Sequence, residues 1–195
     1  MYKDKILAVP TAMLQNPAQP TPLELAKDMV LLEVMHYDFL GQIKIGHIVI
    51  HRLVLANVRF FFKTAFALQF PIHSVIPVSE FGWSDDASCA ANNSSGHNQR
   101  FLADGRMSKH GIGCAIDINP VQNPCFDIDG ETLLLKRIIP PQGIYRPGTP
   151  GTLMKGHPLV TLMERRRWVH GRIWTYPVDP QHFQKVPKAL ASWVK

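Results

Sequence analysis

Two segments far apart in the chain carry residue types that could hold a metal ion. The first, Ser108 to Asp117, contributes an imidazole at His110 and a carboxylate at Asp117. The second, Asp179 to His182, adds another imidazole and a spare carboxylate. Three protein ligands leave a fourth position on zinc for water, and zinc lowers the pKa of that water to about 7, so that it can attack a carbonyl. The inventory fits a hydrolytic zinc site with His110, Asp117 and His182 as ligands and Asp179 as proton acceptor.

The local sequence permits the first two predicted ligands to meet. Gly111 and Gly113 disfavour a helix and allow the tight or positive-φ conformations that a bend requires. Residues 115–119 alternate isoleucine with other residues, which predicts a short strand with the isoleucines on one face and Asp117 on the other.

The second pair needs a bend of its own. Pro180 favours an extended conformation at Asp179, so a helical face is not expected. In a straight strand residues three apart point to opposite sides. A turn or bulge is therefore predicted between Asp179 and His182.

Several stretches of the chain together resemble the D-alanyl-D-alanine carboxypeptidase family, which groups vancomycin-resistance D,D-peptidases with phage L-alanyl-D-glutamate endolysins. They are Asn92–Ser95, Asn98–Arg100, Ser108–Pro124 and Asp179–Phe183. The similarity runs from about Leu32 to Lys185 and is strongest between Asp85 and Pro124. Its specific signal is S-x-H-x6-D followed by a later D-x-x-H.

The resemblance implies a role for each matching residue. His110, Asp117 and His182 match the family's zinc ligands, and Asp179 matches its catalytic carboxylate, which acts as general base and then as general acid. Arg100 matches an arginine that stabilises charge on the attacked carbonyl oxygen. Ser108 matches a motif serine that hydrogen-bonds substrate or a neighbouring group.

The chain departs from the family's pattern on the substrate side. Where the family usually shows Trp-Gly-Gly-x-Trp, the segment His170–Trp174 keeps one glycine and the second tryptophan, so Trp174 is the expected substrate contact. Near Arg100, the segment Gly96–Gln99 replaces the usual aromatic residue and cysteine. These changes are expected to alter the pocket and hence the bond that is cut, whereas the metal set is intact.

Composition describes an ordinary globular chain. With 195 residues, 46% hydrophobic and 18% charged, it can bury a full core. We expect an N-terminal arm or linker at 1–22 and a peptidase domain at 23–195. No apolar run is as long as a membrane span, and none before Pro10 suits a signal peptide. The expectation is synthesis in the cytoplasm and action at the bacterial cell wall or periplasm by a route that the sequence does not encode.

The pattern of apolar residues predicts the elements that position these groups. Strands are expected at Val30–Phe39 and Ile48–Ile50, buried helix at Arg52–Leu68, a long polar loop at Ser84–Arg106, a helix at Leu159–Arg167 and a return to the sheet at Trp168–Phe183. The predicted fold class is α+β, with a small, mainly antiparallel sheet that carries the zinc site and helices on its other face. The resemblance implies the Hedgehog/D-Ala-D-Ala peptidase-like fold.

The predicted function is zinc-dependent hydrolysis of peptide bonds in peptidoglycan stem peptides, of D-alanyl-D-alanine carboxypeptidase or L-alanyl-D-glutamate endopeptidase type. A first alternative is a non-catalytic zinc-containing module that binds cell wall or protein. A second is a basic nucleic-acid-binding protein, because the formal net charge is +6 and Arg165–Arg167 form a dense basic run. No helix-turn-helix, zinc-finger or RNP signature accompanies that charge, so no nucleic-acid partner is expected.

Overall fold

The computed structural model describes residues 1–102 and 104–195 as a mixed α+β fold. Among the described residues the strands form two three-stranded sheets, β1-β2-β3 and β6-β10-β9, and two two-stranded ones, β4-β5 and β7-β8. All of these pairs are antiparallel except β4-β5, which is parallel. The predicted α+β class with small, mainly antiparallel sheets is therefore confirmed.

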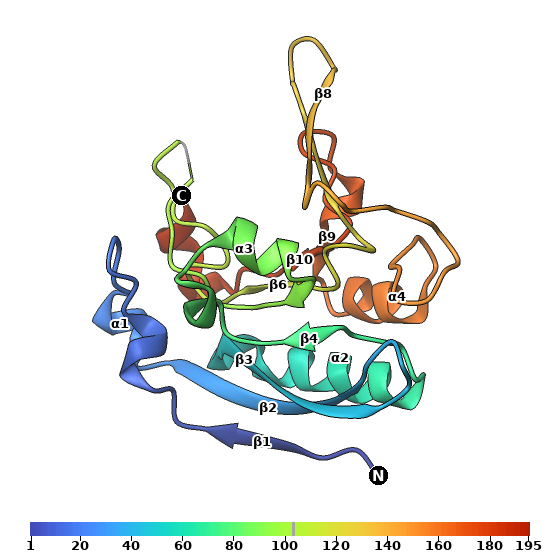
Figure 1. The fold of residues 1–195 in the computed structure, drawn as a ribbon. Coiled ribbons are helices and arrows are strands. Elements are labelled where there is room, and N and C mark those ends of the chain that lie inside the picture. The colour runs from blue at the N-terminus through green and yellow to red at the C-terminus, as the bar shows by residue number, and fades with distance from the viewer. Residues whose placement is uncertain (103) are drawn as a thin grey trace.

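The elements follow one another along the chain as Figure 1 labels them. The strands are β1 (Asp4–Leu7), β2 (Met29–Tyr37), β3 (Ile43–His51), β4 (Ser74–Val75), β5 (Asn93–Ser94), β6 (Ala115–Asp117), β7 (Cys125–Ile128), β8 (Leu135–Ile139), β9 (Val169–His170) and β10 (His182–Gln184). The α-helices are α1 (Leu23–Ala26), α2 (Leu55–Ala67), α3 (Asp85–Ala90) and α4 (Pro158–Arg165). Short 3-10 helices lie at Thr11–Leu14, Arg52–Val54, Val78–Phe81, Gly171–Ile173 and Lys188–Val194.

Helix α2 is the central element of the core. Its buried residues Val58, Phe61, Phe62 and Ala65 follow the three- and four-residue spacing of one helical face. This helix contacts β2 of the first sheet, and the ring of Phe61 lies 5.9 Å from that of Phe183 in β10. A single helix therefore packs against both three-stranded sheets and fixes the second one, which carries two of the predicted metal ligands, Asp117 and His182.

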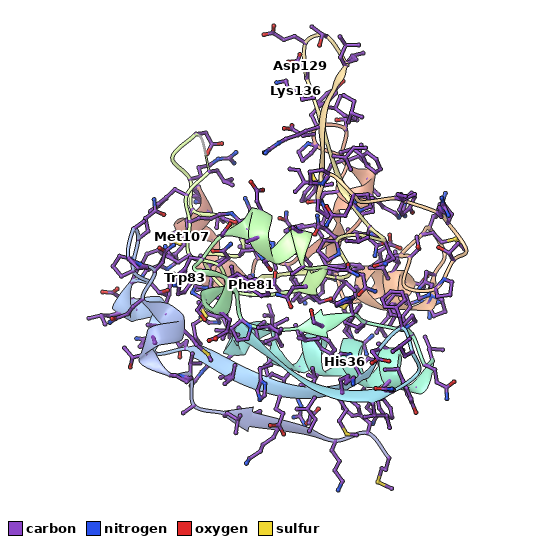
Figure 2. All side chains as sticks on the ribbon, in the orientation of Figure 1. His36, Phe81, Trp83, Met107, Asp129 and Lys136 are labelled. Atoms are coloured by element: carbon purple, nitrogen blue, oxygen red, sulfur yellow. The ribbon has the colours of Figure 1, made fainter. Side chains whose placement is uncertain are left out.

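The β7-β8 hairpin stands out from the rest of the fold (Figure 1). Figure 2 shows Asp129 and Lys136 near its outer end, where the Lys136 Nζ lies 2.8 Å from the Asp129 Oδ2. The base of the hairpin continues into the second half of the site, because Phe126 pairs with Val178, the residue before Asp179.

The predicted loop at Ser84–Arg106 is wrong in its first half. Helix α3 occupies Asp85–Ala90, and β5 follows at Asn93–Ser94. The Ser84 Oγ accepts a hydrogen bond from the backbone N–H of Ala87, as an N-cap does, and two aspartates occupy the first turn. The cap signal was present in the sequence, but the helix is too short to show apolar periodicity.

The N-terminal segment packs on the body of the fold. Strand β1 pairs with β2 in the register Asp4 to Val34, and the Asp4 carboxylate pairs with Arg59 of α2. The division into an arm at 1–22 and a domain at 23–195 stays a prediction. Within residues 1–102 and 104–195, no helix combines the length and the apolar character needed to cross a membrane.

Candidate metal centre and cleft

Strands β6 and β10 bring Asp117 and His182 together. Their antiparallel register pairs Asp117 with His182 and Ile116 with Phe183. Directly paired residues project from the same face of a sheet, so the two polar side chains share one face, and the two apolar ones are buried on the other. The His182 Nδ1 lies 2.9 Å from the Asp117 Oδ1.

His110 arrives from the tight turn that precedes β6. The Ser108 Oγ accepts a hydrogen bond from the His110 backbone N–H at 3.2 Å, and Gly113 adopts a φ of +65°. A Cβ atom on Gly113 would lie 2.7 Å from the backbone nitrogen of His51, so the turn needs the absence of a side chain. The bend predicted from the glycines is confirmed.

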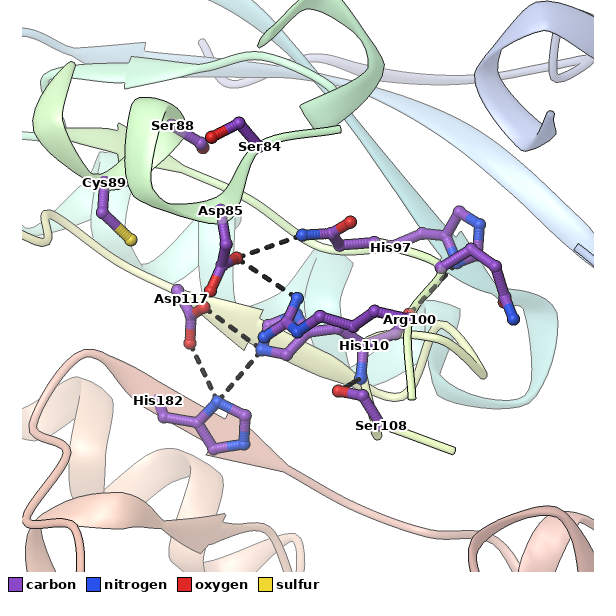
Figure 3. Close-up of polar contacts among 12 residues, drawn as sticks. Ser84, Asp85, Ser88, Cys89, His97, Arg100, Ser108, His110, Asp117 and His182 are labelled. Atoms are coloured by element: carbon purple, nitrogen blue, oxygen red, sulfur yellow. Dashed lines mark hydrogen bonds and ion pairs between the residues drawn. The ribbon is translucent and has the colours of Figure 1, made fainter. Parts of the chain in front are cut away.

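Three ligand atoms converge between the turn that carries His110 and the paired strands β6 and β10 (Figure 3). The His110 Nε2 lies 3.1 Å from the Asp117 Oδ2 and 3.1 Å from the His182 Nδ1. All three residues are buried. Ligands placed tetrahedrally about 2.0–2.1 Å from a zinc ion lie about 3.3 Å apart, so the observed spacing fits one small cation.

The outer hydrogen bonds of the two imidazoles point their free nitrogens at this centre. The His110 Nδ1 lies 2.6 Å from the carbonyl oxygen of Gly96, and the His182 Nε2 lies 3.1 Å from the Gln184 Oε1. With protons on those outer nitrogens, the His110 Nε2 and the His182 Nδ1 carry lone pairs. Two lone pairs and a carboxylate then face one another with no donor between them. This is a donor set that a cation satisfies.

The charged groups in the centre shift one another's pKa values. Burial works to raise the pKa of the Asp117 carboxyl, but His110 and His182 outweigh it and hold that pKa well below its usual value. Burial works to lower the pKa of His110, but the Asp117 carboxylate outweighs it and raises that pKa. The carboxylate is therefore ionised and available as a ligand throughout the physiological range.

Asp179 lies beside the metal centre, at the start of a tight turn. The His182 backbone N–H donates to the Asp179 carbonyl at 3.2 Å, which confirms the predicted bend between the two residues. The Asp179 Oδ1 is buried and has no hydrogen-bond partner among the described residues. Burial, with a smaller contribution from the neighbouring Asp117, raises the pKa of the Asp179 carboxyl to about 7 against the opposing effect of His182. A carboxyl group with this pKa can exchange a proton near neutral pH.

The turn at Asp179 is supported by β9 and by the 3-10 helix that follows it. The Asp179 backbone N–H donates to the carbonyl of Gly171 at 3.0 Å, and a Cβ on Gly171 would lie 2.5 Å from the Asp179 carbonyl oxygen. The His170 Nε2 lies 2.7 Å from the carbonyl oxygen of Pro180, and the His170 ring stacks on Phe183 at 4.3 Å.

Arg100 lies between helix α3 and His110 (Figure 3). Its Nη1 lies 3.2 Å from the Asp85 Oδ1, which also accepts a hydrogen bond from the Asn98 Nδ2 at 3.1 Å. The Arg100 side chain is one-third exposed and lines the same cleft as the metal ligands. The guanidinium thus forms an ion pair with a carboxylate from α3 in the cleft that the metal ligands line.

A cleft of about 710 Å³ opens over these groups. The metal ligands, Asp179, Arg100 and Ser108 all line it. Trp174 lines it as well, with its ring 5.1 Å from that of His182. The fold therefore brings every residue singled out in the sequence into one cleft, while contact of Ser108 and Trp174 with substrate stays a prediction.

Sequence reasoning missed the residues that orient this set. Asp85 forms an ion pair with Arg100. The Gln184 side chain and the Gly96 carbonyl oxygen contact the outer nitrogens of His182 and His110. The His170 ring contacts the Pro180 carbonyl oxygen in the turn. The alternation of β10 places Gln184 on the same face as His182, which was a readable signal. The contacts of Asp85 with Arg100, of Gly96 with His110 and of His170 with Pro180 join separate segments, and no local sequence pattern predicts them.

One protein family model matches a part of the chain that contains most of the site. Residues 103–185 match a family model described as D-alanyl-D-alanine carboxypeptidase. That range contains the three candidate metal ligands and Asp179, whereas Arg100 and Asp85 lie before it. Comparisons with curated proteins and with solved structures gave no match. Residues 103–185, with His110, Asp117 and His182 as their candidate metal site, therefore resemble a D-alanyl-D-alanine carboxypeptidase domain.

Proposed function

We propose that the protein is a zinc-dependent metallopeptidase that hydrolyses peptide bonds in the stem peptides of bacterial peptidoglycan. One observation carries the proposal: the two imidazoles and one carboxylate converge within 2.9–3.1 Å of one another, inside the segment that matches the peptidase family. The family match supports a peptide as substrate, and the wall peptide is the proposed identity of that substrate.

The donor set favours zinc. Two imidazole nitrogens and one carboxylate oxygen are typical ligands of catalytic zinc sites, which keep a fourth position open. When bound, zinc would polarise the scissile carbonyl and lower the pKa of the attacking water. The hydrogen bonds from the outer nitrogens to Gly96 and Gln184 favour this use of both rings, because they fix which nitrogen is free.

Asp179 is the proposed general base and acid. In the proposed reaction its carboxylate removes a proton from the attacking water and then delivers that proton to the leaving amine. Its raised pKa suits both steps, because a group with a pKa close to the working pH is readily deprotonated and readily reprotonated. The unpartnered Oδ1 is the atom proposed to accept the proton.

Arg100 is the proposed partner of the negative charge that develops on the carbonyl oxygen. A fixed cation in a site sheltered from water stabilises such charge strongly, because it needs no reorganisation as the charge forms. Ser108 and Trp174 complete the proposed site. Ser108 orders the His110 backbone, and Trp174 provides an aromatic wall against which the substrate lies.

Two wall bonds are consistent with this site: the terminal D-alanyl-D-alanine bond and the L-alanyl-D-glutamate bond within the stem. Either substrate implies action at the bacterial cell wall or periplasm. Mass spectrometry of defined muropeptides distinguishes them, since release of D-alanine marks a carboxypeptidase, and separated alanine and glutamate fragments mark an endopeptidase.

The decisive variant is Asp179→Asn. We expect turnover to fall by at least about 10²-fold, while zinc content stays at the wild-type level. Digestion by the wild-type protein should stop on addition of a chelator and return with zinc. A non-catalytic wall-binding module predicts that no muropeptide is cut by either protein, and that outcome would contradict the proposal. Strongly salt-dependent DNA binding would instead favour the nucleic-acid alternative.

A further inference from the structure

The N-terminal loop at residues 14–21 is closed by its own hydrogen bonds. The Thr21 backbone N–H donates to the Leu14 carbonyl oxygen at 2.9 Å, which brings the two ends of the loop together. Within the loop, the Asn16 Oδ1 accepts a hydrogen bond from the Ala18 backbone N–H at 3.0 Å, a turn that asparagine favours. Leu14 and Thr21 are both buried, so the two ends are anchored in the fold. The loop therefore presents its side chains from a defined position.

Two side chains of this loop contact the backbone on either side of Arg100. The Asn16 Nδ2 donates to the carbonyl oxygen of Gln99 at 2.9 Å. The Gln19 Oε1 accepts a hydrogen bond from the Phe101 backbone N–H at 3.1 Å. Both contacts join segments that are distant in the sequence, so neither follows from local chain geometry. The loop thus holds both the residue before Arg100 and the residue after it.

A third contact connects the same loop to the turn that carries His110. The Thr21 Oγ1 lies 2.9 Å from the His97 Nε2, and the His97 Nδ1 lies 3.1 Å from the His110 carbonyl oxygen. A carbonyl oxygen can only accept, so the His97 ring donates from Nδ1. Burial lowers the pKa of His97 to about 4, so the ring is neutral and its Nε2 accepts a hydrogen bond from the Thr21 hydroxyl. One buried ring therefore joins the loop to the metal-site turn.

The backbone at Arg100 is also held by the segment before that turn. The Arg100 carbonyl oxygen accepts a hydrogen bond from the Ser108 backbone N–H at 3.1 Å. An arginine side chain is long and flexible, so its guanidinium keeps one direction only when the backbone and the head group are both held. Asp85 pairs with the head group, while the N-terminal loop and Ser108 hold the backbone.

We propose that Asn16 and Gln19 are positioning residues of the catalytic site, which fix the backbone from which Arg100 reaches the cleft. This inference rests on the proposed function, in which Arg100 balances the charge on the attacked carbonyl oxygen. All three residues lie before the segment 103–185 that matches the family model. Loss of the loop contacts should therefore leave the metal ligands intact and slow hydrolysis.

The test compares two variants, each of which removes one loop contact. Gln19→Met removes the acceptor for the Phe101 N–H, and Asn16→Asp removes the donor to Gln99 while it keeps the acceptor for Ala18. We expect kcat to fall about 5-fold in each variant, with KM and zinc content nearly unchanged. Gln19→Glu keeps an acceptor oxygen and should restore most of the kcat that Gln19→Met loses. The substrates are peptides ending in D-alanyl-D-alanine and peptides containing L-alanyl-γ-D-glutamate.

Gln15→Met is the matched control, because Gln15 is exposed in the same loop and lies outside the two contacts with the Arg100 segment. It should keep the wild-type kcat. A second measurement places Gln19→Met in Arg100→Ala protein and follows a single turnover with enzyme in excess. The 5-fold loss should disappear there, because the guanidinium that Gln19 positions is absent.

Wild-type kcat in both Gln19→Met and Asn16→Asp overturns the inference, and a lower melting temperature alone would then limit the loop to stability. A loss from Gln19→Met that is equally large in Arg100→Ala protein overturns it as well. The proposed function fails in a different way. In that case wild-type protein with zinc cleaves neither kind of peptide, and both proposals fall.

Discussion

The Asp85 carboxylate joins Arg100 to helix α3, with its Oδ1 3.2 Å from the Arg100 Nη1 and 3.1 Å from the Asn98 Nδ2. A guanidinium is effective at a reacting centre only when its direction is fixed. Asp85→Asn keeps the size of the side chain but removes the charge that holds Arg100. We expect kcat to fall about 10-fold, a smaller effect than loss of the arginine itself, with zinc content unchanged.

Asp86→Asn is the control for that measurement. Asp86 is exposed in the first turn of the same helix, so it makes a similar contribution to helix stability without touching Arg100. Steady-state kinetics should separate the two variants. Equal loss of activity in both would show that α3 stability, and not the orientation of Arg100, is what Asp85 provides.

Asp179 should make the metal-free protein less stable as the pH rises. Its carboxyl has a pKa of about 7 when folded, against an ordinary value of about 3.9 when unfolded, so the folded state binds the additional proton between these values. The destabilisation therefore appears as the pH rises through this window and is complete above pH 7. We expect Asp179→Asn to raise the melting temperature of metal-free protein at pH 8 and to leave it unchanged at pH 4. Equal shifts at both pH values would contradict a raised pKa.

Gly113 should tolerate no side chain. Alanine there combines a φ of +65° with contacts of 2.7 Å to the His51 nitrogen and the Met29 sulfur. We expect Gly113→Ala to reduce the free energy of unfolding by at least about 2 kcal/mol, measured by urea denaturation. Gly148 has a φ of +84° but open space around it, so Gly148→Ala should cost only about 1 kcal/mol. Similar costs would show that φ alone, and not the close approach to His51, decides the effect.

His170 should act through the turn that carries Asp179. Burial lowers the pKa of His170 to about 4, so its ring is neutral and donates from Nε2 to the Pro180 carbonyl. His170→Phe retains a ring to stack on Phe183 but leaves that carbonyl unpaired, at a cost of about 1–3 kcal/mol. We expect weaker zinc binding and a lower kcat at a temperature where the variant is folded. Unchanged zinc affinity with only a lower melting temperature would limit His170 to stability.

The sequence predicted which residues lie together in the cleft better than it predicted the elements around them. His110 and Asp117 were identifiable because ligand types, glycines and strand alternation act over short distances, and His182 was added through the resemblance to a peptidase family. The ends of strand β2 and helix α2 were predicted to within a few residues, because the apolar pattern of each element extends over enough residues to identify it. Helix α3 was missed since its six residues contain less than two turns.

The supporting contacts could not be predicted for a different reason. The pairing of Asp85 with Arg100, of Gly96 with His110 and of His170 with Pro180 depends on tertiary packing. Nothing in the residue types of either partner specifies the other.

The most direct test of the account is the zinc content of purified protein after loading and removal of excess metal, measured by elemental analysis. Wild-type protein should retain one zinc ion per chain, and His110→Ala, Asp117→Ala and His182→Ala should each lose it. His47→Ala, which removes a histidine of β3 that pairs with Glu33 of β2, should retain the zinc ion. One zinc ion bound equally well by His182→Ala and the wild type would contradict a shared site at these three residues.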